Sequence, residues 1–326
     1  MTREKLDKPK NNYFLSQKDH YQFVSTGCTL LDCALGGGFA LGRVVNVVGD
    51  KSTSKTGIAT ECLINFCRAY PDGQAAYRDV EAAFDTQYAE AMGLPLDKID
   101  LGQEQLTTIE AWHRDLEKFV EQQKKADAPG IYVLDSLDAL SDEAELERDI
   151  GDGSFGAAKA KKSSELFRRL TPKIESSKVL LLIVSQVRDN IGAMFGEKHK
   201  RSGGRALDFF ASQILWLSYL GKLTRTVKKV KRPYGIEIKA LVKKNKIGMP
   251  FRECEVEFHF GYGIEDLISN LNWLKSVGRP FDREINIDNL SNSEYRETAD
   301  QVSQIVKEHW TIIEEGFIPS RSKYAQ

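Results

Sequence analysis

The sequence lacks the features that mark membrane and secreted proteins. No apolar run reaches about 18 residues, the length that a membrane-spanning helix needs. Residues 1–20 contain no apolar core of the kind found in secretory signals. The 5 cysteines form no C-x-x-C pair and no metal-binding spacing with histidine. These absences predict a cytoplasmic protein with reduced thiols and no membrane partner.

Internal repeats and low-complexity stretches are also absent, so the chain is read as globular. Its 326 residues, 41% apolar and 29% charged, can form one large domain with a smaller attachment, or two domains. The net charge of −1 conceals an asymmetry, because residues 159–252 carry 23 Lys or Arg against 6 Asp or Glu. This excess predicts a surface that binds a polyanion. The alternative is that the charges are scattered over solvated faces.

Short β-branched runs alternate with amphipathic helical patterns in the first two thirds of the chain. Runs at 44–48, 74–80, 131–135 and 179–186 read as buried strands, which favours a mainly parallel α/β sheet. From 212 onward the apolar runs follow one another without long helices, so we expect antiparallel strands that extend the same sheet. Two further helical patterns after Gly263 predict a small C-terminal helical domain at 265–326, after a core at 24–264.

The stretch VVNVVGDKSTSKTG, residues 44–57, resembles a phosphate-binding loop with one glycine replaced. The P-loop pattern is G-x-x-x-x-G-K-[ST], and Ser54 stands where the second glycine is expected. Backbone amides after the strand can surround phosphate oxygens at a helix N-terminus, while Lys55 neutralises the β and γ phosphates and Thr56 ligates Mg²⁺. The predicted ATP-binding residues are Gly49, Asp50, Lys51, Ser52, Thr53, Ser54, Lys55, Thr56 and Gly57.

Two of these residues are unusual for such a loop. The Cβ of Ser54 costs about 1 kcal/mol if the backbone there must be left-handed, so we expect weakened nucleotide binding or turnover. Gly57 lies in the first turn of the following helix and should destabilise it slightly.

Acidic residues at two other strand ends supply the remaining parts of a hydrolytic site. Asp135 closes the run IYVLD and is the candidate Mg²⁺ ligand beside Thr56; an ordinary strand-end aspartate is the alternative. A base that activates water should come from a neighbouring strand end. The segment YRDVEAAFD offers Asp79, Glu81 and Asp85, and spacing does not choose among them.

With these parts in this order, the chain resembles the RecA family of recombinases, and in particular its RecA and phage UvsX-like branch. Six segments carry the resemblance in matching order and spacing: VSTGCTLLDCALGGGFALGR (24–43), EAAFDTQYAEAMG (81–93), VLDSLDAL (133–140), DIGDGSFGAAKA (149–160), SQVRDNIGAMFGEKHKRSGGRALDFFAS (185–212) and VKKNKIGMPF (242–251). The fourth resembles the family's first DNA-binding loop and the fifth its second.

The resemblance implies a role for each ambiguous residue. Glu81 would polarise the attacking water, and Gln186 would sense the γ-phosphate and relay its presence to the following loop. Tyr88 would stack on adenine with Asp85 near its amino group. Lys244 and Lys246 would reach the ATP of a neighbouring subunit. The segment 1–23 would contact the adjacent subunit in a helical filament.

The two loop segments also fit single-strand binding on physical grounds. Basic side chains can follow the phosphates while apolar ones pack on bases. The candidate DNA-binding residues are Phe155, Lys159, Lys161, Lys162, Arg168, Arg169, Arg188, Ile191, Phe195, Lys198, Lys200, Arg201, Gly203, Gly204 and Arg205. For the two phenylalanines the alternative is a small local core under each loop. The basic run 228–232 is expected at a hairpin tip, as a solvated turn.

The leading hypothesis is therefore an ATP- and Mg²⁺-dependent recombinase that forms filaments on single-stranded DNA and pairs it with double-stranded DNA. One alternative is a filament or accessory protein in which Ser54 makes hydrolysis negligible. Another is a ring helicase or other RecA-fold motor. The full set of Glu81, Asp135, Gln186 and both lysines argues against the first alternative, and the two loop segments argue against the second.

Overall fold

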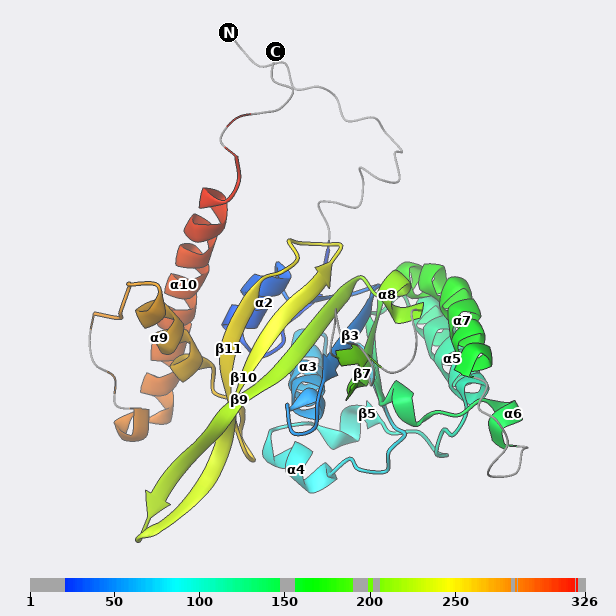
Figure 1. The fold of residues 1–326 in the computed structure, drawn as a ribbon, viewed down its shortest axis with the longest axis horizontal. Helices are drawn as coiled ribbons and strands as arrows, with labels where there is room; N and C mark the ends of the chain where they lie inside the picture. The colour runs from blue at the N-terminus through cyan, green and yellow to red at the C-terminus, as the bar shows by residue number, and fades with distance from the viewer. Residues whose placement is uncertain are drawn as a thin grey trace.

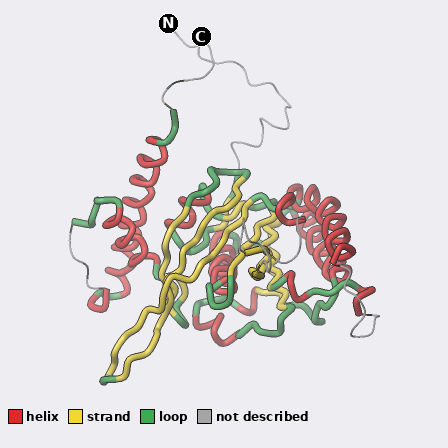
Figure 2. Tube along the Cα trace, viewed as in Figure 1, coloured by secondary structure: helices red, strands yellow, loops and turns green. Residues whose placement is uncertain are grey.

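A computed structural model describes residues 21–146, 156–189, 199–201, 206–282, 285, 287–319 and 321. The expected α/β architecture is confirmed, with one large mixed sheet between layers of helices (Figures 1 and 2). The strands of this sheet run in the order β12-β11-β10-β9-β3-β7-β6-β4-β5, and β8 pairs with β7. A separate two-stranded sheet joins β1 (Phe23–Val24) to β2 (Phe39–Ala40).

The centre of the large sheet is parallel, as the alternating pattern predicts. Its parallel members are β3 (Val44–Gly49), β4 (Gln74–Asp79), β5 (Ile99–Asp100), β6 (Gly130–Asp135) and β7 (Val179–Asp189). Each of the two strands β3 and β6 is buried along its whole length, because helices cover both faces of the sheet there.

The antiparallel extension predicted after residue 212 is also present. It begins at β9, which still runs parallel to β3, and continues outward by antiparallel pairing. Its strands are β9 (Gln213–Val227), β10 (Val230–Asn245), β11 (Glu253–His259) and β12 (Gly263–Ile264). The short β8 (His199–Arg201) lies antiparallel to the end of β7.

Two hydrophobic cores lie on opposite faces of the sheet. On one face α3 (Lys55–Ala69) and α2 (Thr29–Leu35) pack on the strands, and on the other α5 (Ile109–Ala126) and α7 (Gly156–Ser176) do so. Trp112 and Leu116 of α5 are fully buried, as the helical spacing predicts.

Shorter helices connect these elements: α4 (Thr86–Ala91), α6 (Glu143–Leu146), α8 (Ala206–Phe210), η1 (Leu96–Lys98), η2 (Leu137–Ala139) and η3 (Ile287–Asn289).

The two C-terminal helices form where they are expected, α9 at Asp266–Ser276 and α10 at Asn292–Gly316. The Asp266 carboxylate accepts hydrogen bonds from the Thr29 amide and hydroxyl, both at 2.7 Å. Val302 and Val306 of α10 are fully buried in the core that contains α3. The C-terminal helices are thus packed onto the core at α2. In the described ranges, no helix combines the length and apolarity needed to cross a bilayer.

Strands β9 and β10 continue past the body of the molecule as a long hairpin (Figure 1). Val227 pairs with Val230, and the turn between them has positive φ at Lys228 (48°) and Lys229 (68°). Two consecutive residues with positive φ form the kind of tight turn that matches the twist of a hairpin. The basic run 228–232 therefore lies at the hairpin tip, as expected.

Glu61 connects α3 to the start of the C-terminal helices. Its Oε1 accepts the Ile264 amide at 2.9 Å, and burial raises the pKa of this carboxyl from 4.5 to about 7. The folded protein therefore holds the Glu61 proton more tightly than the unfolded chain. The resulting stability is present below about pH 4.5 and is lost as the pH rises towards 7.

We expect the stability of Glu61→Gln not to fall as the pH rises towards 7. The amide oxygen of glutamine still accepts the Ile264 hydrogen bond, but it carries no charge that must be buried. At about pH 8 the free energy of unfolding should rise by on the order of 2 kcal/mol, with little change at about pH 4.5. Urea unfolding at both pH values tests this, with the exposed Glu90→Gln as the matched control. A variant that keeps the wild-type pH slope would contradict the assignment.

Candidate active site

The predicted functional residues on different strands meet at one edge of the sheet. Parallel pairing places Gly49 of β3 opposite Gln186 of β7. It also places Asp79 of β4 opposite Asp135 of β6. Because these strands run in one direction, their carboxyl ends lie together, which is the usual position of ligand sites in open α/β sheets. Segments up to 137 residues apart in sequence therefore converge on this edge.

The loop that follows β3 turns sharply onto the N-terminus of α3. Within it the Asp50 carbonyl accepts hydrogen bonds from the Thr53 hydroxyl at 2.8 Å and from the Lys55 ammonium at 2.7 Å. Ser54 has φ 58° and ψ 34°, and its side chain makes no capping hydrogen bond. The backbone at this position is thus left-handed, the condition under which we expected serine to cost energy. Ser52 is also left-handed, with φ 57°.

The glycines that flank the loop are required by close packing. A Cβ on Gly49 would lie 2.4 Å from the Thr53 Oγ1, inside the turn. A Cβ on Gly57 would lie 2.4 Å from Cζ of Phe258, whose ring comes from β11. The glycine in the first turn of α3 therefore has a packing reason, because it lets that aromatic ring approach the helix.

Thr56 and Asp135 form a pair of oxygen groups beside the loop. The Thr56 hydroxyl donates to Asp135 Oδ2 at 2.6 Å, and the Tyr77 hydroxyl donates to the same oxygen at 2.8 Å. Burial raises the pKa of Asp135, and burial lowers the pKa of Lys55, although nearby carboxylates including Asp135 act in the opposite sense. A hydroxyl and one carboxylate suit Mg²⁺, which typically takes few protein ligands and completes its shell with water and phosphate.

Of the three carboxylates at the end of β4, only Glu81 faces Gln186. Asp79 accepts the amides of Glu81 at 3.1 Å and Phe84 at 2.8 Å, so it shapes the turn. Asp85 caps α4 by accepting the Tyr88 amide at 3.0 Å. Glu81 Oε1 instead accepts the Gln186 side-chain amide at 2.7 Å and the Ser136 hydroxyl.

Gln186 is held from its backbone as well. Its amide donates to Asp138 Oδ2 at 2.6 Å, and Asp138 follows Asp135 on the same loop. The strand that leads into the second predicted DNA segment is therefore tied to the end of β6 and, through the side chain, to Glu81. Two hydrogen bonds to different elements fix the position of a side chain better than one contact does.

A pocket of about 430 Å³ adjoins the loop and contains several of the predicted nucleotide contacts. The P-loop residues from Ser52 to Gly57 form one side, and Asp85 and Tyr88 lie in its wall. Phe84, Phe258 and Phe260 add aromatic surface of the kind that a planar base can pack on. The lining of the pocket thus combines the polar loop with aromatic side chains.

Lys244 and Lys246 lie at the end of β10, where both amines bind carbonyls of α8. The Lys246 ammonium donates to the Phe209 carbonyl at 3.1 Å. The Lys244 ammonium donates to the same carbonyl at 3.2 Å and to that of Asp208. In the single chain the two lysines therefore act as a cap on the helix that follows the second predicted DNA segment.

The structure describes only part of the predicted DNA-binding set. On α7, Lys161 and Arg168 are exposed, Lys162 pairs with Glu110 at 2.6 Å, and Arg169 pairs with Glu165. Lys159, Arg188, Lys200 and Arg201 lie on described backbone, with Arg188 opposite Lys200 across β7 and β8. The candidates outside the described residues are Phe155, Ile191, Phe195, Lys198, Gly203, Gly204 and Arg205.

Several residues of the site were not singled out from the sequence. Ser136 and Asp138 directly follow the predicted magnesium ligand, and their position at a strand end was a usable signal. Tyr77 points inward from a strand and reads as core. Phe258 lies on the distant antiparallel strand β11 and Phe260 in the turn after it, so no local pattern links them to the loop.

Comparisons with known proteins agree with this arrangement. The family model for the RecA N-terminal domain matches residues 13–265. The chain is 34% identical over 244 residues to Protein RecA of Arthrospira platensis and 35% identical over 247 residues to that of Clostridium acetobutylicum. These matches cover 75% and 74% of the chain but 63% and 66% of the relatives, less than two thirds of their length. A match to Protein RecA of Halalkalibacterium halodurans, 32% identical, covers 88% of the chain and 82% of the relative.

The left-handed backbone at Ser54 gives a stability prediction that does not depend on any ligand. Glycine at this position removes the Cβ clash, worth about 1–2 kcal/mol, against a chain-entropy cost of about 0.5–1 kcal/mol. We expect Ser54→Gly to exceed Ser54→Ala in free energy of unfolding by about 0.5–1 kcal/mol. Urea unfolding without nucleotide measures the difference; equal stabilities would mean that the loop relaxes to another conformation.

Proposed function

This chain belongs to the RecA family, and we propose that it is an ATP-dependent recombinase that assembles on single-stranded DNA and pairs it with a homologous duplex for strand exchange. The observation that carries the proposal is the hydrogen bond between Glu81 and Gln186 at 2.7 Å. It joins the carboxylate proposed to activate water to the strand that enters the second proposed DNA segment.

The loop residues would bind and orient the triphosphate of ATP. The backbone amides of residues 50–54 surround the turn at the helix N-terminus, where an anion is favoured. Lys55 would exchange its contact with the Asp50 carbonyl for the β and γ phosphates, which its distance of 2.7 Å from that turn allows. Asp85 and Tyr88 would contact adenine in the aromatic part of the pocket.

Thr56 and Asp135 would hold Mg²⁺, since they are already in contact through one oxygen pair. The ion, when bound, supplies charge that stabilises the phosphates during hydrolysis. The Tyr77 hydroxyl donates to the same Asp135 oxygen as Thr56 and so helps to orient the carboxylate. A hydrogen bond of this type fixes a metal ligand without contacting the metal.

Glu81 would polarise the attacking water, and Gln186 would report whether the γ-phosphate is present. The two side chains share a hydrogen bond, so binding of a phosphate near Gln186 must change either that bond or the rotamer. Because the Gln186 amide is fixed by Asp138, a change of its side chain is transmitted along β7 toward residues 187–205. This gives a physical route from ATP state to DNA affinity.

Lys244 and Lys246 are proposed to act in trans, on the ATP of the next subunit in a helical filament. Positive charge supplied by a neighbour stabilises charge that develops on the phosphates, as arginine fingers do. In the single chain both amines bind carbonyls of α8, which follows the second proposed DNA segment. Assembly would therefore change the α8 contacts and the catalytic site together.

The basic side chains of α7 and of residues 187–205 are proposed to follow the phosphates of single-stranded DNA. Lys161 and Arg168 are free of described ion pairs and exposed, so they suit this role better than Lys162, which is paired. The proposed division of the chain is a subunit-contact segment at 1–23, an ATPase and DNA-binding core at 24–264, and C-terminal helices at 265–326.

A second candidate function is a DNA-binding filament component with negligible hydrolysis. The left-handed Ser54 favours it, because the strained loop lies where the phosphates would bind. The difference between the two candidates is the rate of turnover, since both retain the fold, the nucleotide pocket and the DNA segments.

Turnover separates these candidates directly. We expect phosphate release from ATP to increase when oligo(dT) is added, and Glu81→Gln to reduce the stimulated rate by about 10²–10⁴-fold while nucleotide binding persists. Glu90→Gln, on exposed α4, is the matched control and should leave the rate unchanged.

If the natural protein does not hydrolyse ATP and Ser54→Gly does, the result would support the filament component instead. Silence in both proteins would contradict the proposed active site. A Glu81→Gln variant with full activity would show that another group activates the water.

A further inference from the structure

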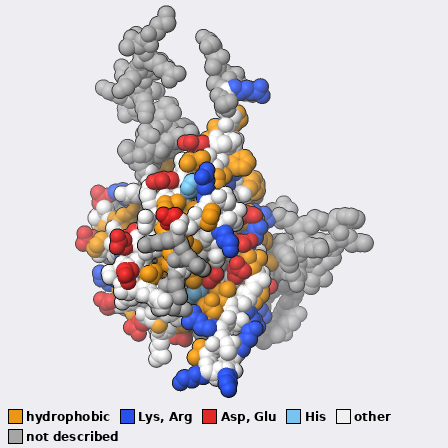
Figure 3. Space-filling view, turned by 90° about the vertical axis from the view of Figure 1, so that its left-hand side faces the viewer, with side chains coloured by type: hydrophobic (Ala, Val, Ile, Leu, Met, Phe, Trp, Pro, Cys, Tyr) orange, Lys and Arg blue, Asp and Glu red, His pale blue; other side chains and the backbone are white. Residues whose placement is uncertain are grey.

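The projecting hairpin, residues 218–236, forms a strongly basic arm. We call it the β-arm. It carries six exposed basic residues and no Asp or Glu: Lys222, Arg225, Lys228, Lys229, Lys231 and Arg232. In Figure 3 these blue side chains gather at its free end. Within the described part of the chain, none of the six has an ion-pair partner.

Two arginines of the β-arm lie side by side although their like charges repel each other. Arg225 lies directly opposite Arg232 in the strand ladder, a like-charge pair that destabilises a hairpin. The Arg225 guanidinium is held over the Tyr234 ring at 4.9 Å, which orients it without neutralising it. Next to this pair, the tip exposes Val227 and Val230, with 59% and 53% of their surfaces accessible. The β-arm thus offers fixed positive charge beside a small apolar tip.

The opposite charge pattern lies on the outer face of β10 and β11. Glu237 lies directly opposite Glu257, and Glu253 and Glu255 continue the same face of β11. Burial and the neighbouring carboxylates of Glu255 and Glu257 raise the pKa of Glu237. Two basic side chains lie among them, since Lys239 pairs with Glu253 at 2.7 Å and His259 Nε2 lies 3.1 Å from Glu257 Oε2.

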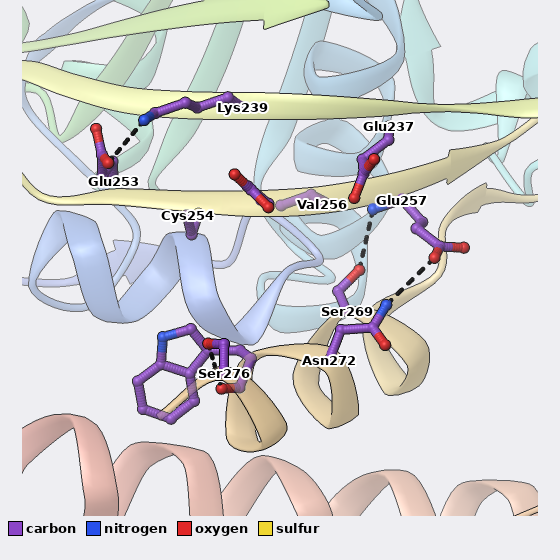
Figure 4. A pocket seen from close by; sticks show the side chains of 11 residues that line it. Glu237, Lys239, Glu253, Cys254, Val256, Glu257, Ser269, Asn272 and Ser276 are labelled. Carbon is purple, nitrogen blue, oxygen red and sulfur yellow. Dashed lines mark hydrogen bonds and ion pairs between the residues drawn. The ribbon is translucent and has the colours of Figure 1, made fainter. Parts of the chain in front are cut away.

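These carboxylates border a hollow of about 310 Å³ between the strands and α9 (Figure 4), which we call the acidic groove. Trp273 gives it its accessible apolar lining, because the side chains of Cys254 and Val256 are almost fully buried, and Ser269 and Asn272 of α9 border it from the other side. The Asn272 amide donates to Glu257 at 3.3 Å and the Ser269 hydroxyl accepts the Glu257 amide at 3.1 Å. The side chains that border the groove are therefore held in place.

The β-arm cannot reach the acidic groove of its own chain. Both lie on the continuous strand β10, with Glu237 in the groove and Val230 at the tip of the β-arm. Seven residues of extended strand place the tip about 24 Å from the groove, at about 3.4 Å per residue. Figure 1 shows the hairpin pointing away from the body. The occupant of the groove must come from another molecule.

We propose that the β-arm of one copy docks in the acidic groove of the next copy. The paired arginines of the β-arm would meet the paired glutamates of the groove, and the valine tip would pack on its apolar lining. Each like-charge pair is relieved by the other, which is electrostatic complementarity between two fixed surfaces. Two different patches are used, so the contact is head-to-tail and continues into an open assembly.

This proposal rests on the filament formation in the proposed function, and names a contact that would hold successive subunits. A polyanion could compete for the β-arm alone. However, the acidic groove at the root of the β-arm repels a polyanion, whereas a second copy of this chain offers a basic arm to the groove and an acidic groove to the arm. Nucleic acid on the β-arm is therefore the outcome that the experiment must separate.

Charge reversal on each surface tests the contact with the full chain. The arm variant is Arg225→Glu with Arg232→Glu, and the groove variant is Glu255→Lys with Glu257→Lys. Sedimentation velocity in the presence of a slowly hydrolysed ATP analogue, without DNA, measures assembly. Each variant alone should assemble at least about tenfold more weakly than the natural chain. Arg225, Arg232 and Glu255 are exposed, whereas the Glu257 side chain is only 13% exposed, so circular dichroism checks that each variant keeps the fold.

An equimolar mixture of the two variants provides the decisive result. The acidic arm of one fits the basic groove of the other, and the remaining basic arm and acidic groove also fit, so the mixture should assemble again. Rescue should weaken in about 1 M salt, where the screening length is about 3 Å. A mixture that stays dissociated, or variants that assemble as the natural chain does, would overturn the proposal.

The same variants identify the competing occupant. Loss of oligo(dT) binding in the arm variant alone, with assembly unchanged, would assign the β-arm to nucleic acid and overturn the contact. The proposed function fails separately: a natural chain that neither assembles with nucleotide nor responds to DNA contradicts the recombinase, whatever the variants do.

Discussion

The register between β3 and β7 is the constraint on which the site depends, and one buried side chain fixes it. The Asn46 amide donates to the Ile183 carbonyl and the Ser185 hydroxyl, both at 2.9 Å, in the centre of the sheet. An unsatisfied amide there would cost about 1–3 kcal/mol, so a shifted pairing is disfavoured. With this register Gly49 lies beside Gln186, and the phosphate loop and the proposed sensor are brought together. The parallel neighbours β6 and β4 then add Asp135 and Glu81 at the same edge.

Around that edge, the proposed phosphate loop and the hydrophobic core constrain neighbouring residues in different ways. Ser54 takes a left-handed backbone although it carries a Cβ, whereas Gly57 takes an ordinary helical one and is glycine because Phe258 fills the space. The loop is therefore strained at one residue and tightly packed at the other. Phe258 comes from β11, so the antiparallel half of the sheet contributes directly to the pocket beside the loop. The same half supplies Lys244 and Lys246, and it carries the β-arm and the acidic groove. The proposed nucleotide site and the proposed subunit contact thus share one set of strands.

Much of the fold followed from the sequence, because buried parallel strands have few polar interruptions and the helices between them are amphipathic. The strand at 44–48, the helix that contains Trp112 and the antiparallel strands after 212 were all read from local patterns. Local patterns did not show which of Asp79, Glu81 and Asp85 faces Gln186. That depends on which carboxylates accept hydrogen bonds from the backbone amides of their own turn. The aromatic wall from Phe258 and Phe260 had no local signal either. Their proximity to the loop arises from sheet order, which local periodicity does not encode. The sequence indicated the hairpin tip at 228–232 but not how far the hairpin projects, since a basic tip of this kind is typical of any solvated turn.

The central claim is that Gln186 couples the nucleotide to the DNA segment through its bond with Glu81. The most direct measurement is fluorescence anisotropy of labelled oligo(dT), titrated with the protein in the presence of a slowly hydrolysed ATP analogue and again with ADP. We expect tighter binding with the analogue in the natural chain and equal binding in the two nucleotide states for Gln186→Ala. If Gln186→Ala keeps the full difference between the two nucleotides, the signal reaches the DNA segment by another route and the account is wrong.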